Sequence, residues 1–379
     1  MCFACSSLPR AGCPRVRRLA LSVLHGAILL LIATPGLSSR PMAEDLPTMV
    51  ITDALGREVV MPRPAERIAM GGRAVLMLAD ALYLFPGASK RLVGVGHITQ
   101  GKGNFLEAID PHYHDDRTIF ASAVGPEQIA ATRPDVVILK SIMRNELGDA
   151  ISQLGIPVVY VDLETPEQYK RDLRIFGRIL EQEARAEELV AYFGEIRRRV
   201  QQRTASLLAE QKPRVLLLSY SESAGEPVFS IPPSRWIQSD LVRAAGGDPV
   251  WVDEHPGGGW APVGFEQIAA WDPDKIMLVA YRHGIDQVTE RVRRRPQWRE
   301  LRAVRDGHLY GFAADFYSWD QPDVRWLLGL QWLATRIQPE VFSDLDINAA
   351  MRDFFSTLYA MTDAEIDSVI VPRLEGDLH

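Results

Sequence analysis

The sequence predicts an α/β protein of two related lobes with parallel central sheets, joined by a single long rigid helix and separated by a ligand cleft. Three observations predict this fold: an internal repeat, short apolar strands that alternate with helices, and a long helical stretch between the two copies of the repeat. The 379 residues are 47% hydrophobic, enough for more than one domain-sized core. We expect a leader over 1–43, an N-terminal lobe over 48–165, a helical segment over 166–211 and a C-terminal lobe over 212–379.

The first 43 residues have the pattern of a signal peptide. Basic residues at 15–18 precede an apolar run from Leu19 to Ile32, and small and turn-forming residues follow it. The apolar run is too short for a comfortable membrane span. We therefore expect export of the chain, with cleavage between residues 36 and 43. All three cysteines lie within the first 13 residues, so the exported part would have no thiol for a disulfide, a metal site or a nucleophile.

The charge of the exported part argues against several partners. Without residues 1–43 the chain has 37 lysines and arginines against 49 acids, a net charge of −12. It has no long basic run to follow a phosphate backbone or an anionic membrane surface. We therefore expect no nucleic-acid binding.

The internal repeat is the most informative feature of the sequence. Residues 124–139 read VGPEQIAATRPDVVIL, and residues 263–278 read VGFEQIAAWDPDKIML. Each copy predicts a short helix that ends before a Pro-Asp turn, which then opens into an apolar strand. Two copies this far apart indicate two related lobes, because a solenoid would repeat every ~20–50 residues.

Short apolar strands alternate with helices on both sides of the chain. Residues 50–60 predict a hairpin, because a turn at 54–56 separates two β-prone runs. The expected strands of the first lobe are 67–70, 92–95, 136–139 and 158–161, and those of the second are 215–219, 276–280 and 308–311. Alternation with helices predicts parallel sheets, whose ligands lie beyond the carboxyl ends of the strands.

A helical stretch over 183–210 lies between the lobes. Its apolar side chains recur at helical spacing, at Leu189, Phe193, Ile196, Val200 and Leu207, and no proline interrupts it. Such a helix would be a strut on the order of 40 Å long. It can also be described as a surface helix with a solvated charge run at 197–199, and the two interpretations are compatible.

These pieces, taken together, resemble the cluster-III solute-binding proteins of bacterial ABC importers, which take up ferric siderophores, haem and cobalamin. The resemblance covers nearly all of 48–370. It rests on the two EQIAA…PD copies, the strut helix, and TDALGREVVMP at 52–62, LGIPVVYVD at 154–162, PQWRELRAVRDGHLYGF at 296–312 and SWDQPDVRWLLGLQWLA at 318–334.

The resemblance implies a monomeric periplasmic protein with no intrinsic cofactor, a shallow interlobe cleft and small hinge motion. Its partners would be a small-molecule metal complex and an ABC permease of the inner membrane. The resemblance also implies a role for Glu127 and Glu266, one in each repeat copy, because exposed glutamates at these places dock onto permease arginines in the family. Alternatively, each is a first-turn acid that favours the helix dipole.

Candidate ligand residues follow the predicted strands. In the first lobe they are Gly72, Arg73, His97, Lys140 and Arg144, a glycine that allows close backbone approach and a possible cationic rim. In the second lobe they are Tyr220, Trp260, Tyr281, Arg282, His283, Tyr317 and Trp319. Aromatic walls with a few cations suit a bulky planar or chelated ligand. Core packing for each aromatic, and solvation for each cation, are the alternatives.

One polar turn has the composition of a metal site. His112 and His114 lie beside Asp115 and Asp116, and imidazoles and carboxylates bind divalent ions. Such residues after Pro111 also suit an ordinary exposed turn, and the resemblance to chelate-binding proteins favours that interpretation over binding of a bare metal ion.

The sequence leaves three functions to compare. Iron-chelate capture is the expectation, with an oxoanion such as molybdate or tungstate, or an exported α/β enzyme, as alternatives. A G-x-S-x-G elbow, a phosphate-binding loop and an H-E-x-x-H motif are all absent. An oxoanion predicts a small cleft with donors from Arg73, His283 or Tyr317. A chelate predicts a wider cleft lined by Trp260, Trp319 and Tyr281.

Overall fold

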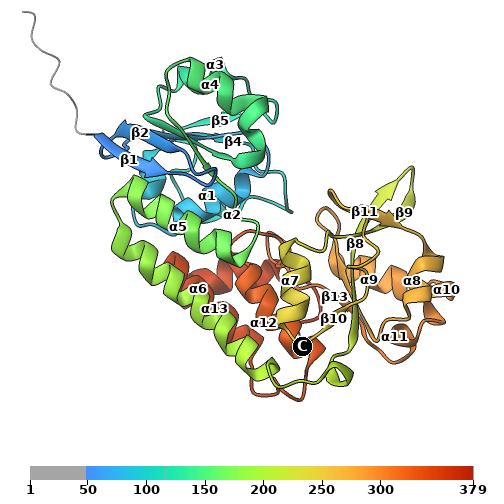
Figure 1. The fold of residues 1–379 in the computed structure, drawn as a ribbon. Helices are drawn as coiled ribbons and strands as arrows, with labels where there is room; N and C mark the ends of the chain where they lie inside the picture. Colours follow the sequence, from blue (N-terminus) through green and yellow to red (C-terminus); the bar gives the residue numbers. More distant parts are fainter. Residues whose placement is uncertain (1–47, 116, 379) are drawn as a thin grey trace, which may run out of the picture. The chain divides into compact units, whose positions relative to one another are not determined.

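A computed structural model describes residues 48–115 and 117–378 (Figure 1). The expected signal peptide over 1–43, with its cysteines, lies outside the described residues. Within them, no helix has the length and apolar character needed to cross a membrane. Two β-sheets and a group of packed helices make up this part of the chain.

The N-terminal lobe is built on an all-parallel sheet, as predicted. Its five strands lie in the order β5-β4-β3-β6-β7, that is Thr118–Phe120, Leu92–Gly96, Ile68–Met70, Val136–Lys140 and Val158–Val161. The predicted hairpin precedes it as β1 (Thr48–Thr52) and β2 (Glu58–Pro62), which pair antiparallel. The lobe's helices are α1 (Val75–Tyr83), α2 (Phe105–Ile109), α3 (Pro126–Ala131) and α4 (Asp149–Gln153).

The C-terminal lobe has a mixed sheet in the order β11-β9-β8-β12-β13, with β10 beside β8. Strands β8 (Arg214–Ser223), β10 (Asp248–Pro249), β12 (Lys275–Val279) and β13 (Leu309–Gly311) are parallel. Strands β9 (Glu226–Ile231) and β11 (Ala261–Val263) add an antiparallel edge that the sequence analysis did not predict. The chain reverses because Ala224 and Gly225 both have positive φ, 51° and 82°, which suits a tight two-residue hairpin turn.

The two copies of the repeat occupy equivalent places in the two lobes. In each, a short helix (α3, and α8 at Phe265–Trp271) leads into a buried strand (β6 and β12). That strand pairs in parallel with the first strand of its sheet on one side and with the following strand on the other. The predicted duplication is therefore a duplication of structure.

Long helices pack between and beside the sheets (Figure 1). The strut is α6 (Glu183–Thr204), 22 residues or roughly 33 Å, six residues shorter than the predicted stretch. It packs on α5 (Pro166–Leu180) and on α12 (Trp326–Ile337), which also contacts α7 (Ile237–Ala244) and α13 (Ile347–Tyr359). The other helices are α9 (Ile285–Arg293), α10 (Pro296–Arg299), α11 (Arg302–Arg305), α14 (Asp363–Glu365) and single turns at Ala88–Arg91, Ser141–Met143, Arg144–Gly148, Ala209–Gln211, Ile366–Ile370 and Val371–Arg373.

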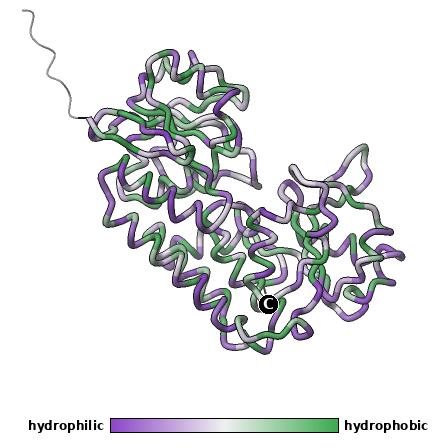
Figure 2. Tube along the Cα trace, in the orientation of Figure 1, coloured by the Kyte–Doolittle hydropathy of each residue, from purple (hydrophilic) through white to green (hydrophobic). Residues whose placement is uncertain are grey.

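The lobes share a hydrophobic core. One continuous cluster of buried apolar side chains runs from the hairpin and α1 through α5 and α6 to the C-terminal sheet. Figure 2 shows the corresponding hydrophobic segments along the strands and the inner sides of the helices. A second, smaller cluster lies on the other face of the N-terminal sheet, under α3 and α4. The described residues accordingly belong to one compact unit.

A buried ionic network joins the lobes. The guanidinium of Arg325, fully buried, donates to Asp80 of α1 at 3.0 Å and to Asp315 at 2.7 Å. Tyr359 donates to the other oxygen of Asp80 at 2.6 Å. Because isolated charges are costly in an apolar interior, Arg325 is held in place by carboxylates from both lobes.

Candidate functional site

A cavity of about 500 Å³ lies between the two lobes. Most of its lining follows the carboxyl ends of strands β3, β4, β6, β7, β12 and β13, where α/β proteins place their ligands. The lining residues are Ala74, Met77, Thr99, Gln100, Ile142 and Glu164 on the N-terminal side, and Trp236, Gln238, Trp260, Tyr281, Arg282, Gln321 and Pro322 on the C-terminal side.

The C-terminal side of the cavity is an aromatic wall. The rings of Trp236 and Trp260 meet edge to face with centroids 5.9 Å apart, and Trp260 meets Tyr281 in the same way at 6.1 Å. Trp260 contacts both of the other rings and restrains them, so the three rings offer a ligand broad surfaces at low entropic cost.

Hydrogen bonds beneath this wall orient it. The phenol of Tyr281 donates to the buried carboxylate of Asp320 at 2.7 Å, and the amide of Gln238 donates to the same oxygen at 3.2 Å. Burial and the Asp320 charge raise the pKa of Tyr281 well above its usual value, so the phenol stays protonated. Burial also raises the pKa of Asp320. The Tyr281 hydroxyl is therefore engaged within the protein, and the ring lines the cavity.

The N-terminal side is aliphatic, with one carboxylate. Met77 of α1 and Ile142 supply apolar surface, and 63% of the Ile142 side chain is exposed. Glu164 follows β7 and accepts a hydrogen bond from the ammonium of Lys140, which is buried and also contacts the Met77 sulfur at 3.2 Å. Lys140 thus neutralises Glu164 from beneath the N-terminal side of the cavity and does not itself line the cavity.

Arg282 leaves the cavity with a net positive charge. Its side chain is exposed at the rim and has no ion pair among residues 48–115 and 117–378. Because Lys140 offsets Glu164, the guanidinium of Arg282 is the uncompensated charge of the described lining.

A smaller cavity of about 250 Å³ lies next to the first and shares Ala74, Thr99 and Gln100 with it. It contains Gly72, Arg73 and His97, three of the candidate residues. Arg73 donates to Glu146 at 2.6 Å, so its charge is already paired.

Several candidates lie away from both cavities. Tyr220 is buried, and its hydroxyl donates to Glu222 at 2.6 Å, while His283 packs edge-on against its ring. Arg144 is exposed at the start of the turn Arg144–Gly148, 3.6 Å from Asp149. These side chains serve local packing and surface pairing in the structure.

The expected cleft positions of Tyr317 and Trp319 are wrong, because both side chains belong to the core. They are 1% and 0% exposed. The ring of Tyr317 lies 4.9 Å from the Arg325 guanidinium, and the indole of Trp319 donates to Asp315 at 3.1 Å. The segment folds inward because Tyr317 contacts Arg325 and Trp319 donates to Asp315, and both partners are buried.

In the histidine-rich turn the two imidazoles pair with different carboxylates, and Asp116 of the predicted cluster lies outside the described residues. His112 pairs with Asp115 at 2.6 Å, whereas His114 pairs separately with Glu107, and both imidazoles are exposed. Among the residues that the structure describes, no group of three or more histidine, cysteine or carboxylate side chains is placed to hold an ion.

Five residues of the lining that offer a ligand polar, sulfur or aromatic contacts were not among the predicted candidates: Met77, Gln100, Glu164, Trp236 and Gln238. Glu164 follows β7 and Gln100 follows β4, so the strand-end rule could have found both. Trp236 and Gln238 lie at the start of α7, after the unpredicted β9, and the expected strand order gave no reason to look there.

Glu127 and Glu266 have the same local geometry. Each is exposed in the first turn of its helix, and neither has an ion pair among the described residues. Each carboxylate lies over the preceding glycine, 3.4 Å from where a β-carbon of Gly125 would be and 3.3 Å from that of Gly264. This arrangement is compatible both with docking and with a purely dipolar role.

Comparisons with known proteins agree with this architecture. A family model described as "Periplasmic binding protein" matches residues 68–315. The molybdate-binding protein MolA of Haemophilus influenzae is 23% identical over 333 residues, which cover 82% of this chain and 90% of MolA. Its molybdate-bound structure has a TM-score of 0.68 at 21% identity, covering 83% of this chain and 98% of that chain.

Two further solved structures are similar. A periplasmic solute-binding protein from Veillonella parvula has a TM-score of 0.69 at 26% identity, covering 86% of this chain and 97% of that chain. CeuE of Helicobacter pylori, solved with a nickel–histidine complex, has a TM-score of 0.66 at 18% identity, covering 86% of this chain and 99% of that chain.

Proposed function

Because this chain belongs to the family of periplasmic binding proteins, we propose that it captures a metal chelate between its lobes and delivers it to a membrane permease. Binding proteins of this family are transport proteins rather than enzymes, carry no intrinsic cofactor and work with a cognate ABC permease. We also propose that residues 1–43 direct this chain to the periplasm.

The observation that carries the proposal is the aromatic wall of the 500 Å³ cavity. That volume lies within the range of about 300–1,000 Å³ typical of sites for drug-sized ligands. Trp236, Trp260 and Tyr281 give the C-terminal side of this cavity a large aromatic surface. Such a surface suits the organic part of a ferric siderophore, a haem or a cobalamin.

The charges of the cavity favour an anionic chelate. Arg282 is uncompensated at the rim, whereas Glu164 is paired with Lys140. A chelate with a negative group could place that group at Arg282 and its organic part against the rings. The nickel–histidine complex of the similar CeuE structure is an example of a small metal chelate held by this fold.

Molybdate is the second candidate, and the similarity to MolA favours it. The cavity argues against it, because the donors expected for an oxoanion do not converge there. Arg73 is paired with Glu146 beside the smaller cavity, His283 packs on Tyr220, and Tyr317 is buried.

Titration by tryptophan fluorescence tests the ligand class. The purified protein is titrated with ferric catecholate and hydroxamate chelates, haem, cobalamin and molybdate. We expect saturable quenching by one of the chelates, because two of the tryptophans line the cavity. Saturation by molybdate alone would replace the chelate with the oxoanion.

The Trp260→Ala variant locates the site. It removes the middle ring of the wall, and we expect chelate affinity to fall at least tenfold, since a buried aromatic contributes a large contact area. Trp260→Phe is the matched control and should retain most of the affinity. If Trp260→Ala binds as tightly as the wild type, the ligand lies elsewhere.

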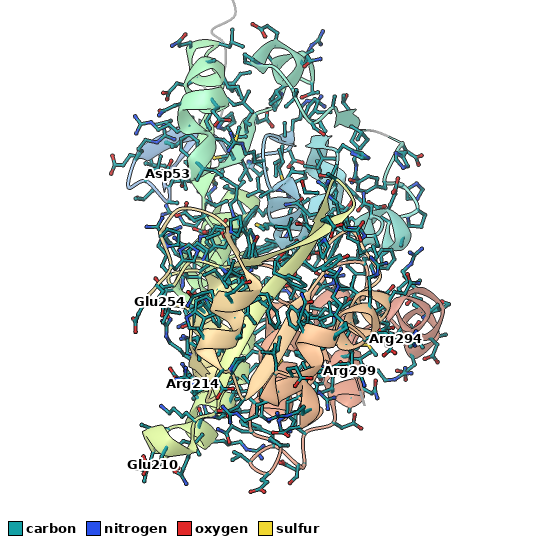
Figure 3. The ribbon with its side chains drawn as sticks, turned by 90° about the vertical axis from the view of Figure 1, so that its right-hand side faces the viewer. Asp53, Glu210, Arg214, Glu254, Arg294 and Arg299 are labelled. Carbon is teal, nitrogen blue, oxygen red and sulfur yellow. The ribbon has the colours of Figure 1, made fainter. Side chains whose placement is uncertain are left out.

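We propose that Glu127 and Glu266 dock onto basic residues of the permease. Both carboxylates are exposed and without ion pairs in the described chain, so they are free to pair with an incoming cation. The double variant Glu127→Ala/Glu266→Ala should bind ligand normally and bind the reconstituted permease more weakly. Glu58→Ala/Glu210→Ala is the control, because it removes the same charge from exposed positions on β2 and beyond the strut. Figure 3 labels Glu210. Unchanged permease binding by the first variant would remove the docking role.

A further inference from the structure

The two lobes differ sharply in charge in the segment that follows the repeat. In the C-terminal lobe, residues 280–308 link β12 to β13 and contain eight arginines and four acids. The equivalent link between β6 and β7, residues 141–157, contains one arginine and two acids. A strongly basic segment has therefore been placed on one lobe of an acidic protein.

Apart from Arg282 at the cavity rim, three of these arginines have no ion pair among the described residues. Arg291, Arg294 and Arg302 pair with Glu222, Glu290 and Asp272 at 2.7, 2.6 and 3.0 Å. By contrast, the described chain supplies no ion pair or side-chain hydrogen bond to the side chains we name the arginine face, which are Arg295, Arg299 and Arg305. Arg299 and Arg305 are exposed and Arg295 is half-buried. Figure 3 shows Arg294 and Arg299 on the same side of this lobe.

Two surface hollows include one arginine of the arginine face each, and Phe265 lines both. One, of about 380 Å³, contains Arg295 with Phe229, Val263 and Trp298. The other, of about 430 Å³, contains Arg305 with Leu301 and Glu300. Phe265 immediately precedes Glu266, so the arginine face and the hollows are continuous with the glutamate of the repeat.

We propose that the arginine face and its two hollows form a docking surface for an acidic segment of the permease that also presents apolar side chains. The proposal rests on the proposed function, in which Glu266 docks onto the same permease. Carboxylates of the partner would pair with the three free guanidinium groups, and its apolar side chains would enter the hollows around Phe265.

The mixed charge of the surface favours a protein over a lipid bilayer. Glu266, Glu300 and Asp272 lie among the arginines, and an anionic headgroup layer would be repelled by each of them. A folded partner can place a cation opposite Glu266 and anions opposite the arginines. Hollows of this size also receive protruding side chains, which a headgroup layer does not offer.

The experiment compares two charge-matched triple variants. Arg295→Gln/Arg299→Gln/Arg305→Gln removes the arginine face. Arg174→Gln/Arg198→Gln/Arg199→Gln removes the same charge from exposed positions on α5 and α6. Binding is measured to the permease reconstituted in nanodiscs of zwitterionic lipid. We expect about a tenfold lower association rate constant for the first variant only, with a shallower dependence on salt, because exposed interface charges act mainly on encounter.

Other outcomes separate this proposal from the docking proposal. Equal binding by the two triple variants would overturn the role of the arginine face and leave Glu127 and Glu266 unaffected. Empty nanodiscs of phosphatidylglycerol test the bilayer directly. If the arginine face contributes only to binding these discs, its partner is lipid and the proposal is wrong. Loss of permease binding by the arginine variant, with none for the Glu127/Glu266 variant, would keep the face and reject the glutamates.

Discussion

The two lobes share one element and differ in the segment that follows it. The helix and strand of the repeat, α3 with β6 and α8 with β12, occupy equivalent places and carry Glu127 and Glu266 in matching geometry. The next links diverge: one is short and weakly charged, the other carries eight arginines. The strand is fixed by burial on both sides, whereas only the inner side of the link is buried and its outer side can acquire new charges.

The two lobes also line the cavity with different kinds of side chain. The N-terminal lobe supplies aliphatic surface and a neutralised carboxylate, and the C-terminal lobe supplies the rings and Arg282. A ligand with one aromatic or extended organic part would bind the two sides unequally. The two lobes therefore share the repeat that frames the cleft and differ in the side chains that line it.

The largest loss of stability should come from disrupting the ionic network that joins the two lobes. Arg325→Met leaves Asp80 and Asp315 buried without their cation, and we expect a loss of about 3–5 kcal/mol in the free energy of unfolding. Urea denaturation measures it. Adding Asp80→Asn and Asp315→Asn should recover much of the loss, because neutral amides then replace the two carboxylates that Arg325 contacts with its side chain. A loss below about 1 kcal/mol for the single variant would contradict the role of the network.

A smaller loss is expected from the loop that carries Gln100 into the cavity. A β-carbon on Gly101 would overlap the Phe316 carbonyl oxygen and the ring of Tyr317, so Gly101→Ala must push the lobes apart locally. We expect destabilisation of about 1–3 kcal/mol by denaturant unfolding.

Gly194→Ala is the control for this change. Gly194 lies inside the strut helix with nothing near its missing β-carbon, so alanine should stabilise the protein by about 0.5–1 kcal/mol. Equal effects of the two substitutions would mean that the Gly101 contact carries no stability.

The smallest effect should come from separating the two glutamates. Glu127→Ala and Glu266→Ala, tested singly, should each weaken permease binding by about threefold to tenfold, since each removes one exposed interface charge. Binding to the reconstituted permease by surface plasmon resonance gives the two values. If the arginine face acts beside Glu266, it still binds the permease when Glu266 is removed. Glu266→Ala should then lose less permease binding than Glu127→Ala. A tenfold greater loss at Glu266 than at Glu127 would break that expectation.

Most of the fold could be predicted from patterns of apolar and turn residues within short stretches of the sequence. The hairpin over 50–60, the repeat and the strut are confirmed because each is set by local spacing of apolar and turn residues. The antiparallel β9 and β11 were missed, because the hairpin turn at Ala224 and Gly225 follows polar residues that do not read as a strand.

The site was only partly predictable for a related reason. The strand-end rule placed Tyr281 and Arg282 near a cleft, and the structure has both in the cavity lining, together with Trp260 of the HPGGGW segment. It failed for Tyr317 and Trp319, because their burial depends on Arg325, which is itself held by Asp80 more than 200 residues away. No local pattern reports a contact of that range.

The segment at 375–377 closes the junction between the lobes. Glu375 accepts hydrogen bonds from the backbone of Ile285 at 3.1 Å and from Lys102, and Asp377 accepts from the backbone of Gly311 at 2.6 Å. Residues 375–377 therefore tie the backbone of the C-terminal lobe to Lys102 of the N-terminal lobe, and a variant that lacks them would lose this connection.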